Sequence, residues 1–195
     1  MSPQSLHLRL VGGRGDAGQP LDRIDPIAVI EVDHLLKFEL CDVLERLADG
    51  LPHETIKSQA EVAVTVLRQG LPDHIVLEER YLFPLLKKRN NGDARVRSVL
   101  EQLEHEHDHD EAFSFEIAEE LERLADDGRA SNAEMLGYML RGYFVSLRRH
   151  IKWENATVLP LARQMLTAAD LDELREGIME RSRRHAGRLS GIHSL

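Results

Sequence analysis

Residues 74–85 read HIVLEERYLFPL, and residues 150–161 read HIKWENATVLPL. In both segments a histidine is followed four residues later by a glutamate, and six residues after that by Pro-Leu. Residues four apart on an α-helix lie on the same face, about one turn apart. If both segments are helical, each can present an imidazole nitrogen and a carboxylate to the same side of its helix.

A shorter pattern is also repeated. Residues 30–34 read IEVDH and residues 103–107 read LEHEH, so each has an apolar residue, a glutamate, any residue, an acid and a histidine. The final histidines of this pair are 73 residues apart, and the histidines that open the longer segments are 76 apart. Two patterns repeated at nearly the same offset indicate that a unit of two helices occurs twice.

Helical periodicity extends over most of the chain. From residue 26 onward apolar residues recur every three or four positions, which is typical of amphipathic helices. Breakers rich in Gly, Pro, Asn and Asp divide this pattern at residues 49–52, 90–93 and 126–128. Pro72 is expected to kink or interrupt the second helix. The pattern predicts four long helices and a shorter fifth, at residues 26–48, 54–89, 94–125, 131–165 and 168–184.

The short connections restrict the topology. Because each breaker has only a few residues, consecutive helices are expected to be antiparallel neighbours. The sequence therefore predicts an all-α protein, an up-down-up-down antiparallel four-helix bundle with a short C-terminal fifth helix. The expected organisation is a flexible N-terminal arm at residues 1–25, the bundle at residues 26–166, and a C-terminal helix and tail at residues 167–195.

Composition excludes several classes of protein. The chain has 195 residues, of which 42% are hydrophobic and 30% charged, and this balance is typical of a globular domain. The net charge of −9 argues against nucleic acid as a partner, and no apolar run is long enough for a membrane span. The single Cys41 cannot form an intramolecular disulfide or a cysteine-based zinc site. We expect a soluble, cytoplasmic protein.

The four histidines of the repeated patterns fall at similar heights along the expected bundle. His107 precedes the turn at 126–128 by 19 residues, and His150 follows Ser131 by 19 residues, about 28 Å in each helix. The histidines of the first two helices match less closely. We expect one layer to contain six metal-ligating side chains: His34, His74, Glu78, His107, His150 and Glu154.

These residue types indicate a particular class of metal. Imidazole nitrogens and carboxylate oxygens suit iron, manganese or zinc better than calcium. Two carboxylates on facing helices would allow bridging and therefore two metal ions. A single buried histidine is more often a hydrogen-bonded core residue, but six such groups without a cation would bury charge at a large cost.

The third long helix has alternating histidines at positions 105, 107 and 109, so a ligand has to be chosen. Two residues rotate an α-helix by about 200°, and His107 therefore points away from His105 and His109. His107 shares a face with Leu103 and Ile117. We predict that His107 points inward and that the other two are solvated.

Taken together, the motifs resemble the hemerythrin-like, or HHE cation-binding, domains of bacteria: His34, residues 74–84, Glu106-His107 and residues 149–160. The resemblance covers residues 22–165. It implies a non-heme centre of two iron ions, bridged by the carboxylates of Glu78 and Glu154. It also implies a small exogenous ligand such as dioxygen, nitric oxide or peroxide. The protein partner, if there is one, is unknown.

The chain departs from oxygen-carrying hemerythrins in two places. Glu111 stands where those proteins have a second histidine one turn after His107, and is a possible additional ligand. The last helix has a glutamate four residues after His150, where they have an aspartate five residues after. A carboxylate-rich shell stabilises ferric iron, which favours sensing or iron and redox handling over reversible oxygen transport. A di-iron oxidoreductase, peroxidase-like or nitric-oxide-handling, and a metal-stabilised helical scaffold are the alternatives.

Other polar residues are expected to have structural roles. Tyr81 and Tyr143 could line the metal pocket, but core packing is the preferred interpretation. Glu31 and Glu104 are expected near the ligands or on the surface. The basic residues of the last helix are expected to form a solvated face, with a docking patch as the minority interpretation: Arg175, Arg181, Arg183, Arg184 and Arg188.

Overall fold

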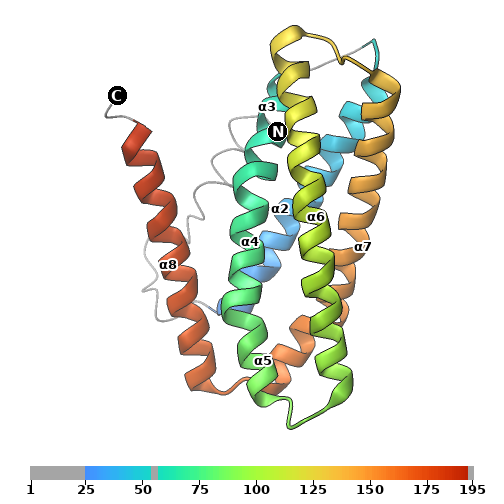
Figure 1. Ribbon diagram of the computed structural model, residues 1–195. Coiled ribbons are helices and arrows are strands. Elements are labelled where there is room, and N and C mark those ends of the chain that lie inside the picture. Colours follow the sequence, from blue (N-terminus) through green and yellow to red (C-terminus); the bar gives the residue numbers. More distant parts are fainter. Residues whose placement is uncertain (1–24, 54–56, 193–195) are drawn as a thin grey trace.

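The computed structural model describes residues 25–53 and 57–192, with side chains described as far as residue 183 apart from the gap (Figure 1). The N-terminal arm expected at residues 1–25 lies almost entirely outside this part of the chain. Within the described residues the protein is all-helical, as the periodicity predicted. In that part of the chain no helix is both long and apolar enough to cross a lipid bilayer.

Four long helical stretches lie side by side, and a fifth helix lies against their flank (Figure 1). The second stretch is continuous but has two short π-helical turns, η2 and η3, within it. The elements are α2 (Pro26–Gly50), α3 (Lys57–Thr65), η2 (Val66–Gly70), α4 (Leu71–Leu77), η3 (Glu78–Leu82), α5 (Phe83–Arg89), α6 (Ala94–Asp127), α7 (Ala133–Met165) and α8 (Ala168–Ile192).

The helix ends follow from local side-chain chemistry. The side chains of Asp25, Asp93 and Asn132 accept hydrogen bonds from backbone N–H groups of the first turns of α2, α6 and α7. Gly128 ends α6 in the left-handed conformation, at φ 70°, which favours glycine. These caps confine the connections to the short breakers seen in the sequence.

The two π turns coincide with the prolines of the second stretch. The Leu71 N–H donates to the Val66 carbonyl, and the Phe83 N–H donates to the Glu78 carbonyl, five residues back in each case. Pro72 and Pro84 follow these turns directly. Proline has no N–H group to donate to a carbonyl of the preceding turn. A π turn shifts the backbone hydrogen-bond pattern by one residue, so each proline can begin the next α-helical segment without ending the helix. Pro72 therefore modifies this helix and does not interrupt it.

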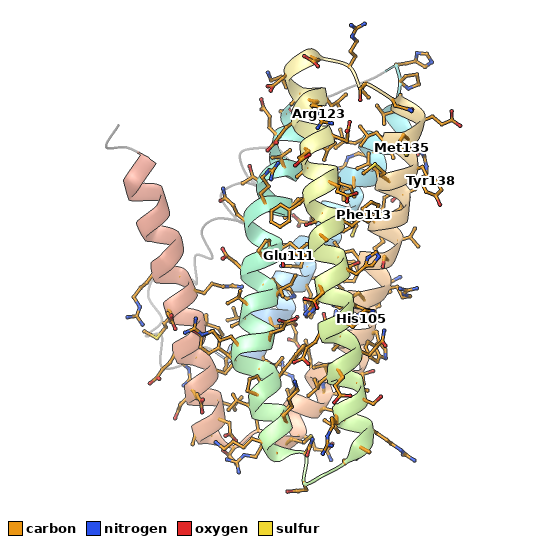
Figure 2. All side chains as sticks on the ribbon, in the orientation of Figure 1. His105, Glu111, Phe113, Arg123, Met135 and Tyr138 are labelled. Carbon is orange, nitrogen blue, oxygen red and sulfur yellow. The ribbon has the colours of Figure 1, made fainter. Side chains whose placement is uncertain are left out.

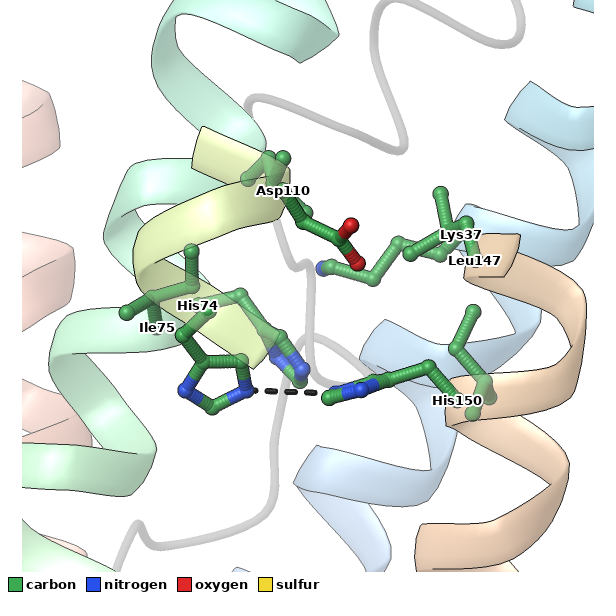
Figure 3. Close-up of a pocket in the computed structure, with 9 residues that line it drawn as sticks. Lys37, His74, Ile75, Asp110, Leu147 and His150 are labelled. Carbon is green, nitrogen blue, oxygen red and sulfur yellow. Dashed lines mark hydrogen bonds between the residues drawn. The ribbon is translucent and has the colours of Figure 1, made fainter. Parts of the chain in front are cut away.

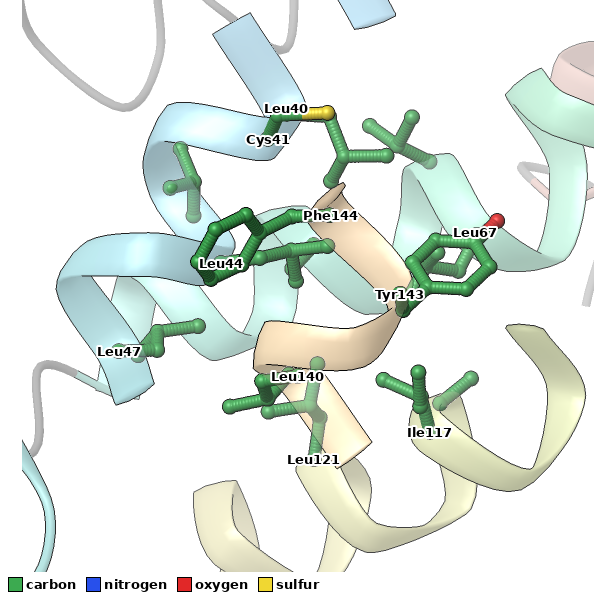
Figure 4. Packing of buried hydrophobic residues seen from close by; sticks show 14 of the residues in the cluster. Leu40, Cys41, Leu44, Leu47, Leu67, Ile117, Leu121, Leu140, Tyr143 and Phe144 are labelled. Carbon is green, nitrogen blue, oxygen red and sulfur yellow. The ribbon is translucent and has the colours of Figure 1, made fainter. Parts of the chain in front are cut away.

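Two apolar clusters fill the space between the four long stretches. One lies toward the end of the molecule that contains the α6–α7 connection and includes Leu44, Leu121, Leu140 and Tyr143 (Figure 4). The other includes Phe83 and lies toward the opposite end. Along α2 and α6, His34 and His107 fall between residues of the two clusters, and on α7 His150 lies at the edge of the first cluster, on the side of the second. A polar layer therefore separates two dry ends of the core.

Helix α8 is longer than predicted, because it reaches Ile192 where the sequence pattern ended at residue 184. Its first half packs on the flank of the bundle, with Leu174 completely buried and Ile178 packed against the second cluster. Arg89 pairs with Asp170 near the start of α8, at 2.7 Å between Nε and Oδ2. The chain therefore returns along the outside of the second stretch.

Candidate metal centre

The six side chains expected in one layer do converge. Two groups of possible ligand atoms each lie within 4.8 Å of one another, and the groups share Glu154. The first group has four residues and the second has three. All are buried: His34, His74, Glu78 and Glu154 in the first, and His107, His150 and Glu154 in the second.

Each of the four histidines of the layer directs its Nε2 atom toward the two carboxylates. Glu78 and Glu154 are completely buried at the middle of the layer, and each lies near histidines from more than one helix. His34 Nε2 lies 3.5 Å from Glu78 and 3.4 Å from Glu154. The Nε2 atoms of His74 and His107 each lie 3.4 Å from Glu78. His150 Nε2 lies 3.4 Å from Glu154.

These inward atoms are poorly satisfied by the protein itself. Neither oxygen of Glu78 or of Glu154 has a hydrogen-bond partner, and the same is true of His34 Nε2. The His107 and His150 Nε2 atoms lie 3.2 Å apart and can only share one proton. Buried polar atoms without partners are costly, and a cation between them would remove that cost. The donor set therefore fits a metal of the type expected from the sequence.

The outward nitrogens are held by acceptors from neighbouring helices. In three histidines Nδ1 makes a short hydrogen bond to a side-chain oxygen. These bonds join His34 to Asn155 Oδ1 (2.7 Å), His107 to Glu79 Oε1 (2.9 Å) and His150 to Glu106 Oε2 (2.9 Å). The fourth contact, between His74 Nδ1 and Asp33 Oδ2, is longer at 3.6 Å.

The four contacts form a closed ring around the layer. Each acceptor is next in sequence to an inward residue of its own stretch and contacts a histidine of the next one, in the order α2, the second stretch (α4 and η3), α6, α7 and back to α2. Acceptors in these positions fix the orientation of a metal-binding imidazole and raise its basicity. The ring indicates a site built to direct all four Nε2 atoms toward one place.

The charges of the layer change the protonation of its histidines. Burial alone would lower the pKa of His150, but the Glu154 carboxylate 3.4 Å away and the hydrogen bond to Glu106 raise it to about 10. His74 is different, since burial lowers its pKa to about 3 despite the charge of Glu78. Without a metal, the protein therefore holds at least one buried imidazolium close to the carboxylates.

A small cavity of about 10 Å³ adjoins the layer, with room for roughly one water molecule (Figure 3). Three of the converging histidines line it, together with Lys37 and Asp110. Lys37 is only 5% exposed, and burial lowers its pKa although the Asp33 charge opposes this. Burial raises the pKa of Asp110. The cavity therefore combines apolar walls with one basic and one acidic side chain.

The other α6 residues considered as metal ligands do not point into the layer. His107 is 3% exposed and faces the layer, whereas His109 and His105 (labelled in Figure 2) are exposed. Glu111, the possible additional ligand, is partly exposed and belongs to neither group of possible ligands. Asp110, the residue before it, faces the cavity instead.

The remaining polar residues divide between core and surface. Tyr143 lies in the first apolar cluster and does not line the cavity. Glu31 pairs with Arg163, and Glu104 with Lys87, on the outside of the bundle.

One of the C-terminal basic residues, Arg181, was expected to be solvated but is partly buried. Arg181 is 19% exposed and pairs with Asp33 of α2. Docking of α8 brings it there, which helical periodicity alone did not show. The side chains of Arg184 and Arg188 lie outside the described residues.

Sequence reasoning named the inward residues but assigned no role to the ring of acceptors or to the cavity residues. A signal for the ring was present, because each acceptor directly flanks an inward residue: Asp33, Glu79, Glu106 and Asn155. One residue rotates a helix by about 100°, so such a neighbour points toward the adjacent helix. Lys37 and Asp110 follow His34 and His107 by three residues, which places them one turn further along the same face.

Comparison with known protein families agrees with this geometry. The model of the hemerythrin HHE cation-binding domain matches residues 25–162, which is most of the chain and includes the whole layer. The searches of curated proteins and of solved structures gave no significant match. On the family match, the chain belongs to the hemerythrin HHE cation-binding domain family.

Proposed function

We propose that the protein holds two iron ions in this layer and uses them to bind or sense a small molecule. The observation that carries the proposal is the pair of ligand groups that share Glu154. Glu78 also faces histidines of both groups, through Oε1 to His34 and through Oε2 to His107. Two carboxylates that each reach both groups are suited to bridging two cations.

Iron is the preferred metal because the donors are four imidazoles and two carboxylates, a mixture that also accommodates manganese or zinc. The four long stretches would hold these donors as an up-down-up-down antiparallel bundle, which the short connections favour. The family match supports a cation at this place, and the unsatisfied oxygens of Glu78 and Glu154 support it independently.

The cavity suggests what the centre handles. A di-iron centre, when bound, supplies redox chemistry and coordination positions for a small ligand. The second ligand group has three residues against four in the first, and two of its histidines line the cavity. Leu147 and Ile151 contribute apolar walls that limit water. A space of this size is closer to dioxygen, nitric oxide or peroxide than to an organic substrate, so binding or sensing is favoured over an oxidoreductase.

The experiment follows the absorption spectrum of the iron-loaded protein. Ferrous protein is prepared without oxygen, exposed to air and then flushed with argon. We expect a new spectrum that persists until a reductant is added, because Glu78 and Glu154 are anionic and favour ferric iron. A spectrum that returns to the ferrous form under argon would support reversible oxygen transport. Absence of any change with dioxygen or nitric oxide would contradict small-ligand binding.

A further inference from the structure

Asp33 differs from the other three acceptors of the ring. Its Oδ2 atom lies 3.6 Å from His74 Nδ1, whereas the other acceptors lie 2.7 to 2.9 Å from their histidines. His74 Nδ1 consequently has no hydrogen bond although it is buried. The same Oδ2 atom is the one that Arg181 of α8 contacts. One carboxylate oxygen therefore faces both an arginine and an incompletely satisfied histidine.

Arg181 reaches Asp33 because α8 is docked on the flank of the second stretch. The Tyr81 hydroxyl donates to Glu180, and Leu174 is completely buried. Gly177 lies so close to the Tyr81 ring that a Cβ atom there would be 2.5 Å from ring carbons. The contact between Arg181 and Asp33 thus depends on close packing of α8, an element outside the four long stretches.

We propose that Arg181 withholds Asp33 from His74, so that docking of α8 and metal binding at His74 oppose each other. The inference rests on the proposed metal centre and adds a regulatory role for α8. When α8 is docked, Asp33 is paired with Arg181 and supports His74 poorly. When α8 is released, Asp33 closes onto His74 Nδ1 and completes the ring.

The direction of the effect follows from the chemistry of imidazole. A cation on Nε2 makes the Nδ1–H group a stronger hydrogen-bond donor, which draws the Asp33 carboxylate toward His74 and away from Arg181. Coupling between two binding events is reciprocal. If docking of α8 lowers the metal affinity by some factor, metal binding lowers the equilibrium constant for docking of α8 by the same factor. Metal occupancy would then be signalled by a loosened C-terminal helix.

The first test measures ferrous iron affinity by anaerobic competition with a chelator. Arg181→Gln should bind iron about tenfold more tightly than the wild type, the lower end of the effects seen for groups that orient metal ligands. Arg183→Gln is the matched control, since Arg183 is exposed on the same helix. Arg181→Lys should restore wild-type affinity. In an Asp33→Asn background, Arg181→Gln should have no further effect.

The second test measures docking directly, by amide hydrogen exchange of residues 168–183 in metal-free and iron-loaded protein. We expect faster exchange in the iron-loaded protein, the reverse of the usual protection by a ligand. Gly177→Ala undocks α8 without changing any charge, and it should also raise iron affinity.

The outcomes separate this inference from the proposed function. If the wild type binds no iron, the metal centre itself is wrong. If it binds two iron ions but Arg181→Gln binds them equally or more weakly, or if iron slows exchange in α8, opposition between α8 and the metal is refuted while the metal centre stands.

Discussion

Replacement of His107 by alanine, compared with replacement of His105, tests the inward direction assigned to α6. The two residues are on one helix and differ in burial, since His107 is 3% exposed and His105 lies on the outside. The His107 ring stacks on Phe83, with ring centroids 5.8 Å apart and planes inclined by 8°. Its Nδ1 atom bonds to Glu79 at 2.9 Å. His107→Ala removes both contacts and one metal ligand.

The expected loss of unfolding free energy in His107→Ala has two parts, one without metal and one with metal, that can be measured separately. Without metal, the stacked pair is worth about 0.5 to 1.5 kcal/mol and a hydrogen bond to a charged group about 1.5 to 3 kcal/mol. Glu79 is one-third exposed and regains water, so we expect a total loss of about 2 kcal/mol. With free metal at 100 times the dissociation constant, a bound ion adds about 2.7 kcal/mol to the wild type. In His107→Ala, metal should add much less than this to the free energy of unfolding.

The assay is urea unfolding of both variants and the wild type, with and without metal. His105→Ala should change the free energy of unfolding by less than about 0.5 kcal/mol in either condition, as expected for an exposed helical site. His107→Ala should be destabilised in both conditions and more so with metal. If the two variants behaved alike, or if the His107→Ala loss were the same with and without metal, His107 would not be a ligand.

Three other predictions concern the surroundings of the layer. Glu79→Ala should lower iron affinity by about 10- to 100-fold in a chelator competition, because His107 loses its orienting acceptor, whereas Glu101→Ala on the surface should not. Lys37→Met should weaken azide binding to the ferric protein by about tenfold, measured by absorption titration, because a positive charge at the cavity is lost; unchanged affinity would remove Lys37 from the ligand site. Iron affinity should rise by about tenfold per pH unit between pH 7 and 9, measured by titration at fixed ionic strength, because the proton held by His150 at a pKa of about 10 must leave before the metal binds. A flat profile would show that His150 carries no such proton.

Much of the fold was predictable because amphipathic helices and their breakers are local features of sequence. The spacing of His74 and Glu78, and of His150 and Glu154, predicted two inward faces without any knowledge of packing. The π turns were not predictable in this way. They change helical phase through backbone hydrogen bonding, and Pro72 and Pro84 signalled only that some irregularity was present.

The parts of the site that depend on contacts between helices were harder to foresee. Asp33 and Asn155 directly flank predicted ligands in the sequence, but the histidine that each contacts emerges only when the neighbouring helix is placed beside them. Arg181 is a stronger example, since its partner is 148 residues away in the chain. Charge patterns along one helix carry no information about which carboxylate a docked helix will meet.

The most direct test of the account is the number of iron ions held by each chain. Metal-free protein is loaded with excess ferrous iron without oxygen, freed of unbound iron by gel filtration, and analysed for iron and protein. Glu154 belongs to both ligand groups, and Glu78 faces histidines of both. This arrangement predicts a plateau at two iron ions per chain. A plateau at one, or no retained iron, would contradict a bridged pair of metals at this layer.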